Sequence, residues 1–179
     1  MSRTTLDWLL HWAEQTPDRV FLQQPIGDQV QTWSWAESRN AVLRMATALT
    51  RYPRGSRIGI TGRNTAHWLL ADLAIAAAGH ISIGFYAKQT TGLVRYIAEH
   101  AGLAAVFVGP MAEPHHVLDG FGAHIERIRL PYPEVAPEAQ DWDTLLAAHA
   151  PITPTSPDPD AVWTLVYTSG TTGDPKGVM

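Results

Sequence analysis

The stretch RIGITGRNTAHWLLADLAIAAAGHISIGFY, residues 57–86, decides the fold of this chain. Residues 57–61 and 80–86 have the short apolar runs of buried strands, and residues 65–78 between them favour a helix. The same order continues with a helix expected over residues 90–101 and a strand over residues 104–108. Strands that alternate with helices are typical of a parallel sheet. The sequence therefore predicts an α/β fold, with a mostly parallel sheet and flanking helices.

The residues before this stretch predict a small unit of two helices and a hairpin. Two polar pairs at three-residue spacing are capping boxes, and each should begin a helix. A turn pair between them favours a hairpin. The capping pairs are Thr4 with Asp7 and Ser34 with Glu37, and the hairpin strands are residues 21–24 and 30–33 around Gly27-Asp28.

The residues after position 108 predict three further elements. A strand is expected over residues 125–130, a helix over 142–149 and a strand over 161–168. The last is apolar enough to be a central strand covered on both faces. The proline-rich residues 131–137 and 150–160 should be extended, irregular loops.

Composition narrows the class of protein. The 179 residues suit one domain, and 45% hydrophobic with 17% charged residues describe a globular chain. The formal net charge of −4 argues against nucleic acid as a partner, because neutralising many phosphates takes clustered Lys and Arg. The absence of Cys excludes disulfides and a cysteine nucleophile. With neither a secretory signal nor a transmembrane segment apparent, we expect a cytoplasmic protein.

The first helix is amphipathic, which leaves peripheral membrane contact as an alternative to packing on the core. Its charges are Arg3, Asp7 and Glu14, and these do not make the basic face that anionic lipid favours. We therefore expect the helix to pack on the protein itself.

The chain ends on YTSGTTGDPKGVM, residues 167–179, whose chemistry suits a polyphosphate. Hydroxyls, a lysine and glycines occur together, and Gly170 and Gly173 allow consecutive N–H groups to converge on one anion. The spacing is not that of a Walker loop, since Pro175 precedes Lys176 and no Ser or Thr follows it. We therefore expect a clasp of strand, loop and strand, with a plain polar connection as the alternative.

This terminal motif resembles the phosphate-binding signature of the AMP-forming adenylating enzymes, a superfamily that includes acyl-CoA synthetases, peptide-synthetase adenylation domains and luciferases. Residues 31–37 and 57–68 resemble early segments of the same superfamily. Residues 81–86, 94–97 and 104–109 are similar to its long-chain fatty acid–CoA ligases, although residues 83–88 lack the proline-bearing segment that relatives often have.

The resemblance implies that the complete enzyme uses Mg-ATP to adenylate a fatty acid and then passes the acyl group to coenzyme A. The loop would hold the β- and γ-phosphates, and Thr168 falls at the position associated with Mg²⁺. The implied cofactor-binding residues are Thr168, Ser169, Gly170, Thr171, Thr172, Gly173, Lys176 and Gly177.

On the same resemblance, residues 1–179 are expected to be a partial N-terminal AMP-binding domain without the C-terminal domain, and to contain no catalytic residue. Such a chain should be inactive by itself. Two other interpretations stay open. One is a non-catalytic module that binds a nucleotide or a partner, and the other is a truncated gene product without function.

Weaker signals favour structural roles. His115-His116 is a poor metal site, because adjacent side chains point in different directions. His67, His80 and His100 fall at the ends of expected elements, where we expect surface or helix-terminal residues. The tryptophans at positions 8, 12, 33 and 35 should pack in the core or cluster together rather than stack on bases.

Overall fold

The computed structural model describes residues 3–155, 158–168 and 175–179. Within these residues the main sheet has the strand order β7-β6-β5-β3-β4-β8-β9, and neighbouring strands are parallel except β8 and β9. The α/β fold and the mostly parallel sheet are thus confirmed. The strands are β3 Arg57–Thr61, β4 Ile81–Phe85, β5 Leu103–Val108, β6 Glu126–Arg129, β7 Gln140–Asp141, β8 Thr164–Thr168 and β9 Lys176–Val178.

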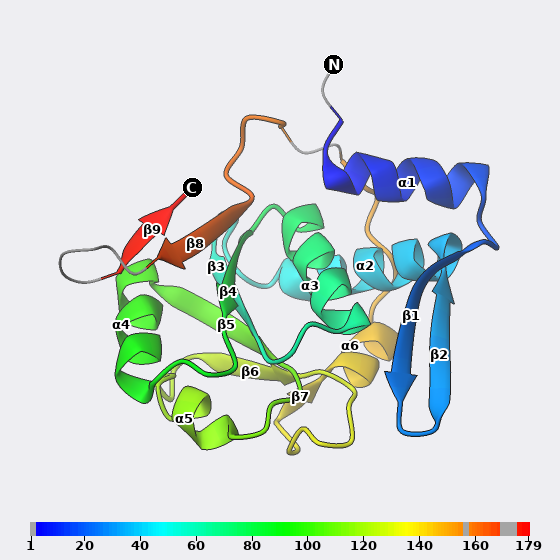
Figure 1. Cartoon of the computed structure of the whole chain (residues 1–179). Helices are drawn as coiled ribbons and strands as arrows, with labels where there is room; N and C mark the ends of the chain where they lie inside the picture. Colours follow the sequence, from blue (N-terminus) through cyan, green and yellow to red (C-terminus); the bar gives the residue numbers. More distant parts are fainter. Residues whose placement is uncertain (1–2, 156–157, 169–174) are drawn as a thin grey trace.

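Helices cover both faces of this sheet (Figure 1). On one side lie α2 (Trp35–Leu49), α3 (Ala66–Ala77) and α6 (Trp142–Ala148). On the other lie α4 (Thr91–Ala101) and α5 (Pro114–Leu118). Because both faces are covered, the central strands are mostly apolar, and Ile58, Ile60 and Val106 are fully buried.

The expected N-terminal unit of helix and hairpin is present. Helix α1 (Thr5–Gln15) packs against α2, and β1 (Val20–Ile26) pairs antiparallel with β2 (Gln29–Ser34). Leu6 and Leu9 of α1 are buried against the core, as predicted. Among the described residues, no helix has both the length and the apolar character needed to cross a membrane.

The predicted capping residues begin their helices. The side chains of Thr4 and Ser34 each accept a hydrogen bond from the backbone N–H three residues on. The carboxylates of Asp7 and Glu37 in turn accept a hydrogen bond from the backbone N–H of the cap residue, which completes both capping boxes. Thr65 caps α3 by accepting from the Trp68 N–H. Local chemistry thus sets three helix starts.

Strand β8 differs from the expected strand over residues 161–168. The Ala161 N–H donates to the Asp158 carbonyl, so a turn occupies the first of those residues and the strand begins only at Thr164. The expectation that both faces would be covered is wrong for the described structure, because Val166 is 45% exposed. The short elements α5 and β7 were not predicted from the sequence.

The order of the strands creates a switch point in the middle of the sheet. From β3 the chain goes to β4 on one side, whereas from β5 it goes to β6 on the other, so the connections that follow β3 and β5 run toward opposite edges of the sheet. Gly62 and Gly109 bring the two backbones together there, with the Gly109 N–H donating to the Thr61 carbonyl at 2.8 Å. Gly62 has a φ of 120°, which side chains disfavour.

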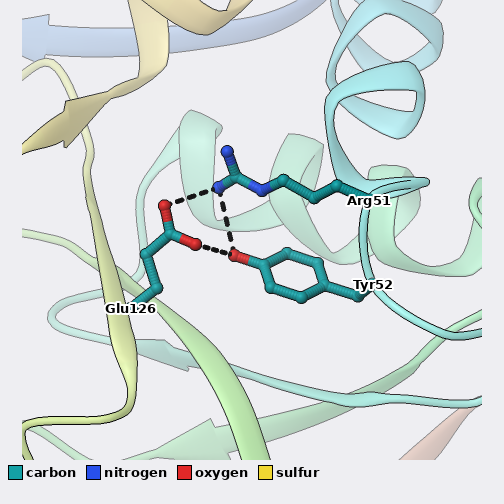
Figure 2. Close-up of polar contacts among 3 residues, drawn as sticks. All are labelled: Arg51, Tyr52 and Glu126. Carbon is teal, nitrogen blue, oxygen red and sulfur yellow. Dashed lines mark hydrogen bonds and ion pairs between the residues drawn. The ribbon is translucent and has the colours of Figure 1, made fainter.

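A polar cluster of three residues fastens the end of α2 to the start of β6 (Figure 2). Arg51 places one nitrogen 2.9 Å from a carboxylate oxygen of Glu126 and 3.0 Å from the hydroxyl of Tyr52. The Tyr52 hydroxyl donates a hydrogen bond to the other oxygen of Glu126. The cluster lies at the amino-terminal end of β6, the opposite edge from the one where α/β sheets bind ligands. We therefore assign it to stability.

Candidate phosphate-binding site

The last two strands form the predicted clasp. Strands β8 and β9 are antiparallel, with Thr168 opposite Lys176, Tyr167 opposite Gly177 and Val166 opposite Val178. Residues directly opposite each other in an antiparallel pair place their side chains on the same face. Thr168 and Lys176 are therefore neighbours on one face, at the two ends of the connecting loop.

The two faces of the clasp differ in exposure. Side chains alternate along a strand, so Thr168 and Val166 share one face of β8 while Tyr167 lies on the other. Thr168, Lys176 and Val166 are exposed, whereas Tyr167 is only 8% exposed. The face that carries the hydroxyl and the ammonium group is thus the open one.

The clasp also stands at the ligand-binding edge of the sheet. Strand β8 runs parallel to β4, so its last residue, Thr168, lies at the carboxyl edge. Ligands of open α/β sheets bind outside the carboxyl ends of the strands. An anion that met the clasp would find a hydroxyl donor and a cation there.

Tyr167 anchors the clasp on the covered side. Its hydroxyl lies 2.9 Å from Nδ1 of His100 in α4, and the two rings meet edge to face with centroids 5.8 Å apart. Burial raises the pKa of the Tyr167 phenol, and the neighbouring Tyr96 adds to the rise, so the neutral phenol is held across a wide pH range.

Of the predicted site residues, the structure brings Thr168, Lys176 and Gly177 together in the clasp. The other five lie outside the described residues, and nothing is stated of their positions. They are Ser169, Gly170, Thr171, Thr172 and Gly173.

Two of the histidines expected at the surface or at helix ends are buried: His67 lies in the first turn of α3, and His80 directly precedes β4. His67 is 4% exposed, places Nδ1 2.9 Å from the Tyr132 hydroxyl and packs edge to face against Trp142. His80 is 3% exposed and donates from Nε2 to the Leu49 carbonyl at 3.0 Å. Each ring is held by a residue distant in sequence, a contact that the local pattern cannot indicate.

The remaining histidine pair is exposed on α5. His116 places Nε2 3.3 Å from a carboxylate oxygen of Glu113, and both side chains are mostly exposed. Across the described ranges, no group of three or more His, Asp or Glu side chains is arranged to hold a metal ion.

Two hollows lie away from the clasp. One of about 170 Å³ sits at the switch point and is lined in part by Arg63, Asn64 and Tyr132. Another, of about 450 Å³, lies near the amino-terminal ends of the strands beside His80 and Trp163. In the first, Arg63 already pairs with Glu134 at 3.4 Å, so its charge is partly neutralised.

Comparison with known proteins places the chain in a family. The model of the AMP-binding enzyme family matches residues 9–179, which is nearly the whole chain. The chain therefore belongs to the AMP-binding enzymes, the family that the terminal motif predicted.

Curated relatives include several CoA ligases. The chain is 29% identical to long chain acyl-CoA synthetase 1 of Arabidopsis thaliana, over 93% of this chain and 28% of that protein. It is 30% identical to sulfoacetate–CoA ligase of Cupriavidus necator, over 93% of this chain and 32% of that protein. The chain thus spans about a third of the length of these relatives.

Solved structures share the fold. Acetoacetyl-CoA synthetase from Streptomyces lividans superposes with a TM-score of 0.83 at 22% identity, over 97% of this chain and 29% of that one. O-succinylbenzoate coenzyme A synthetase from Bacillus subtilis, in complex with AMP, gives a TM-score of 0.70 at 28% identity, over 96% and 41%.

Sequence reasoning missed His100 as part of this site. It lies 67 residues before Tyr167 and was assigned only to a helix end. His100 lies in the last turn of α4, one turn after Tyr96. This position does not indicate which strand lies beside the helix. Only the pairing of β8 with β4 brings the two together.

Proposed function

We propose that residues 168–177 bind the β- and γ-phosphates of Mg-ATP in an acyl-CoA-forming ligase. The observation that carries the proposal is the pairing of Thr168 with Lys176 on the exposed face of the clasp, at the carboxyl edge of the sheet. A hydroxyl donor and a point charge at one place suit the oxygens of a polyphosphate. Membership of the AMP-binding enzymes supports ATP as the source of that phosphate.

The residues present fit the implied nucleotide and metal. Lys176 is exposed and would neutralise the outer phosphates, while the hydroxyl of Thr168 is an oxygen ligand of the kind that Mg²⁺ accepts. The loop between them would add hydroxyls from Ser169, Thr171 and Thr172 and backbone N–H groups that include those of Gly170 and Gly173. Gly177 would add a further backbone N–H group. Bound Mg²⁺ would supply charge neutralisation for the departing pyrophosphate.

The substrate class that we propose is a carboxylic acid activated as its adenylate and transferred to coenzyme A. Among the relatives named above, one is a long chain acyl-CoA synthetase and another a sulfoacetate–CoA ligase, which supports acid–thiol ligation as the common chemistry. Within that class we favour a long-chain fatty acid, because residues 81–86 and 104–109 resemble that branch. Comparing the activity of the ligase on fatty acids with its activity on short polar acids would measure this preference.

We assign residues 1–179 to the AMP-binding domain of such a ligase and propose a cytoplasmic location. The family model over residues 9–179 supports the domain assignment. The chain spans about a third of the relatives' length. We therefore assign only phosphate binding to this chain, and we assign the complete reaction with an acid and coenzyme A to a ligase of the relatives' length.

Calorimetric titration of the chain with Mg-ATP tests the proposal. We expect saturable binding that weakens when Mg²⁺ is chelated, because the metal shields the phosphate charges from one another. Inorganic pyrophosphate should compete, since it presents the same groups to the loop. A titration with no heat of binding at millimolar Mg-ATP, from a chain shown to be folded by its circular dichroism, would remove the proposal.

A further inference from the structure

The phosphate-binding clasp is fixed to the rest of the fold through Tyr167. This residue directly precedes Thr168 and stands opposite Gly177, which directly follows Lys176. A Cβ atom added to Gly177 would lie 3.3 Å from Cζ of Tyr167, so the ring lies close over the glycine backbone. Tyr167 therefore sits between the two residues that bear the proposed phosphate contacts and the body of the protein.

The partner of Tyr167 on the body of the protein is His100. Nδ1 of His100 lies 2.9 Å from the Tyr167 hydroxyl, and the pair is part-buried, with Tyr167 buried and His100 exposed. The ring of Tyr96 stacks on the same imidazole, with centroids 5.6 Å apart and an interplanar angle of 23°. The stack limits rotation of the imidazole and thereby fixes the direction of the hydrogen bond.

The end of α4 that carries His100 is itself tied to the central strand. Arg57 of β3 donates from Nε to the Ala101 carbonyl at 2.6 Å, and its other nitrogens reach the carbonyls of Gly102 and Gly55. The bonds to Ala101 and Gly102 satisfy carbonyls at the end of α4 that have no partner within the helix. A continuous set of contacts therefore runs from β3 through the end of α4 to the clasp.

His100 cannot act on the phosphates directly from this position. It contacts Tyr167, which lies on the covered face of the clasp, whereas Thr168 and Lys176 lie on the opposite, exposed face. Any effect of the imidazole on a bound nucleotide has to pass through the placement of the strands. His100 is therefore a positioning residue, which acts on the site only through the strands of the clasp.

We propose that His100 positions the phosphate-binding clasp through its hydrogen bond to the Tyr167 hydroxyl, and so sets the affinity of the chain for the phosphates of Mg-ATP. The proposal rests on the proposed function. Without the bond, β8 and β9 would shift or open more often, and the donors would meet the phosphates less well aligned. Binding groups have to be held within about 0.5 Å of the productive geometry, so looser strands lower affinity.

Two measurements on the full chain test the proposal. The first is the rate at which trypsin cuts after Lys176, read as release of the terminal Gly-Val-Met peptide by mass spectrometry. Cleavage of a folded segment reports how often that segment opens. The second is the dissociation constant for Mg-ATP from the protection that the nucleotide gives against the same cut.

The variants isolate the hydrogen bond from the ring packing. Tyr167→Phe keeps the ring over Gly177 and removes only the hydroxyl, and His100→Ala removes the partner. His100→Asn returns a polar atom near the position of Nδ1 and should restore the bond. Tyr96→Phe is the matched control, because it removes a hydroxyl from the same cluster without touching the bond between His100 and Tyr167.

For Tyr167→Phe and His100→Ala we expect cleavage about threefold to tenfold faster and a dissociation constant for Mg-ATP raised by a similar factor, the effect of losing one net hydrogen bond. His100→Asn and Tyr96→Phe should stay within about twofold of the unmodified chain. Circular dichroism and the melting temperature identify any variant that has unfolded, and Tyr167→Phe, the least disruptive change, then decides.

Three results would overturn this inference while leaving the proposed function standing. Unchanged cleavage in Tyr167→Phe would show that the hydroxyl does not hold the clasp. Faster cleavage with an unchanged dissociation constant would make the bond a purely structural one. Equal losses in Tyr96→Phe and Tyr167→Phe would point to general loosening of the cluster. Failure of Mg-ATP to protect even the unmodified chain would instead refute the proposed function, and this inference with it.

Discussion

Thr168 and Lys176 are register partners at the open end of β8 and β9, and both side chains are exposed on the same face. Eight positions separate them in the sequence, and the antiparallel pairing returns the chain so that a hydroxyl and an ammonium group become neighbours. This juxtaposition gives the terminal motif its chemistry, because polyphosphate oxygens need both donors and positive charge.

The polar cluster of Arg51, Tyr52 and Glu126 should make stability sensitive to high pH. Burial first, and then the hydrogen bond to Glu126, raises the pKa of Tyr52 from 10.0 to about 12. A raised folded-state pKa means that the stabilisation is complete below pH 10 and is lost as the pH rises through 12. Urea unfolding at pH 8 and at pH 11 should therefore show a drop in the free energy of unfolding.

Replacing Tyr52 by Phe removes this contribution. We expect the free energy of unfolding at pH 7 to fall by about 1–3 kcal/mol, since a bond to a charged group is lost and Glu126 loses a partner. The drop between pH 10 and 12 should become smaller. Tyr86→Phe is the control, because Tyr86 is 66% exposed, and a drop of equal size in both variants would contradict the assignment.

Burial of His67 predicts that the protein loses stability at low pH, whereas the cluster around Tyr52 loses its contribution at high pH. Burial lowers the pKa of His67 from 6.5 to about 4, so the folded protein favours the neutral imidazole. The stabilisation is complete above pH 6.5 and is lost as the pH falls through 4, by up to about 3 kcal/mol. Urea unfolding at several pH values across this window measures it.

The variant His67→Phe keeps an aromatic ring against Trp33 and Trp142 and removes the titrating group. Its free energy of unfolding should change less between pH 6.5 and pH 4 than that of the unmodified chain. His115→Asn, at an exposed position, should leave the pH profile as it is. Parallel profiles for the unmodified chain and His67→Phe would refute the prediction.

Gly62→Ala should destabilise the switch point by about 2–4 kcal/mol, because a positive φ and a steric clash add. The new Cβ would lie 2.7 Å from the carbonyl carbon of Gly109, a backbone atom that cannot turn away. Gly92→Ala in α4 is the matched control, since no atom lies within 4 Å of the new methyl group and a helical alanine is favoured by up to about 1 kcal/mol. Thermal unfolding of both variants gives the comparison, and equal melting temperatures would contradict it.

The sequence indicates the fold wherever local chemistry decides the structure. The caps at Thr4 and Ser34 begin their helices as predicted, because a side-chain oxygen and a nearby N–H suffice. Alternation of apolar strands and helices over residues 57–108 is enough to predict the parallel sheet. The clasp was also predictable, since Pro175 disfavours the helix that a Walker loop would begin.

Features that depend on distant partners escaped prediction. His67 was expected at the surface or at a helix end, and in the first turn of α3 Tyr132 and the surrounding rings bury it. The contact between His100 and Tyr167 joins α4 to β8 only because β8 pairs with β4. No local pattern records which strands become neighbours, so the support of the clasp, unlike its chemistry, required the structure.

The central claim is that Lys176 binds the phosphates of Mg-ATP, and a matched pair of lysine variants tests it most directly. Lys88 is the only other lysine in the sequence, and it too is exposed. Calorimetry should give a dissociation constant for Mg-ATP raised about tenfold or more in Lys176→Gln, as expected for losing one charge-assisted contact, and an unchanged value in Lys88→Gln. Equal dissociation constants for the two variants and the unmodified chain would contradict the account.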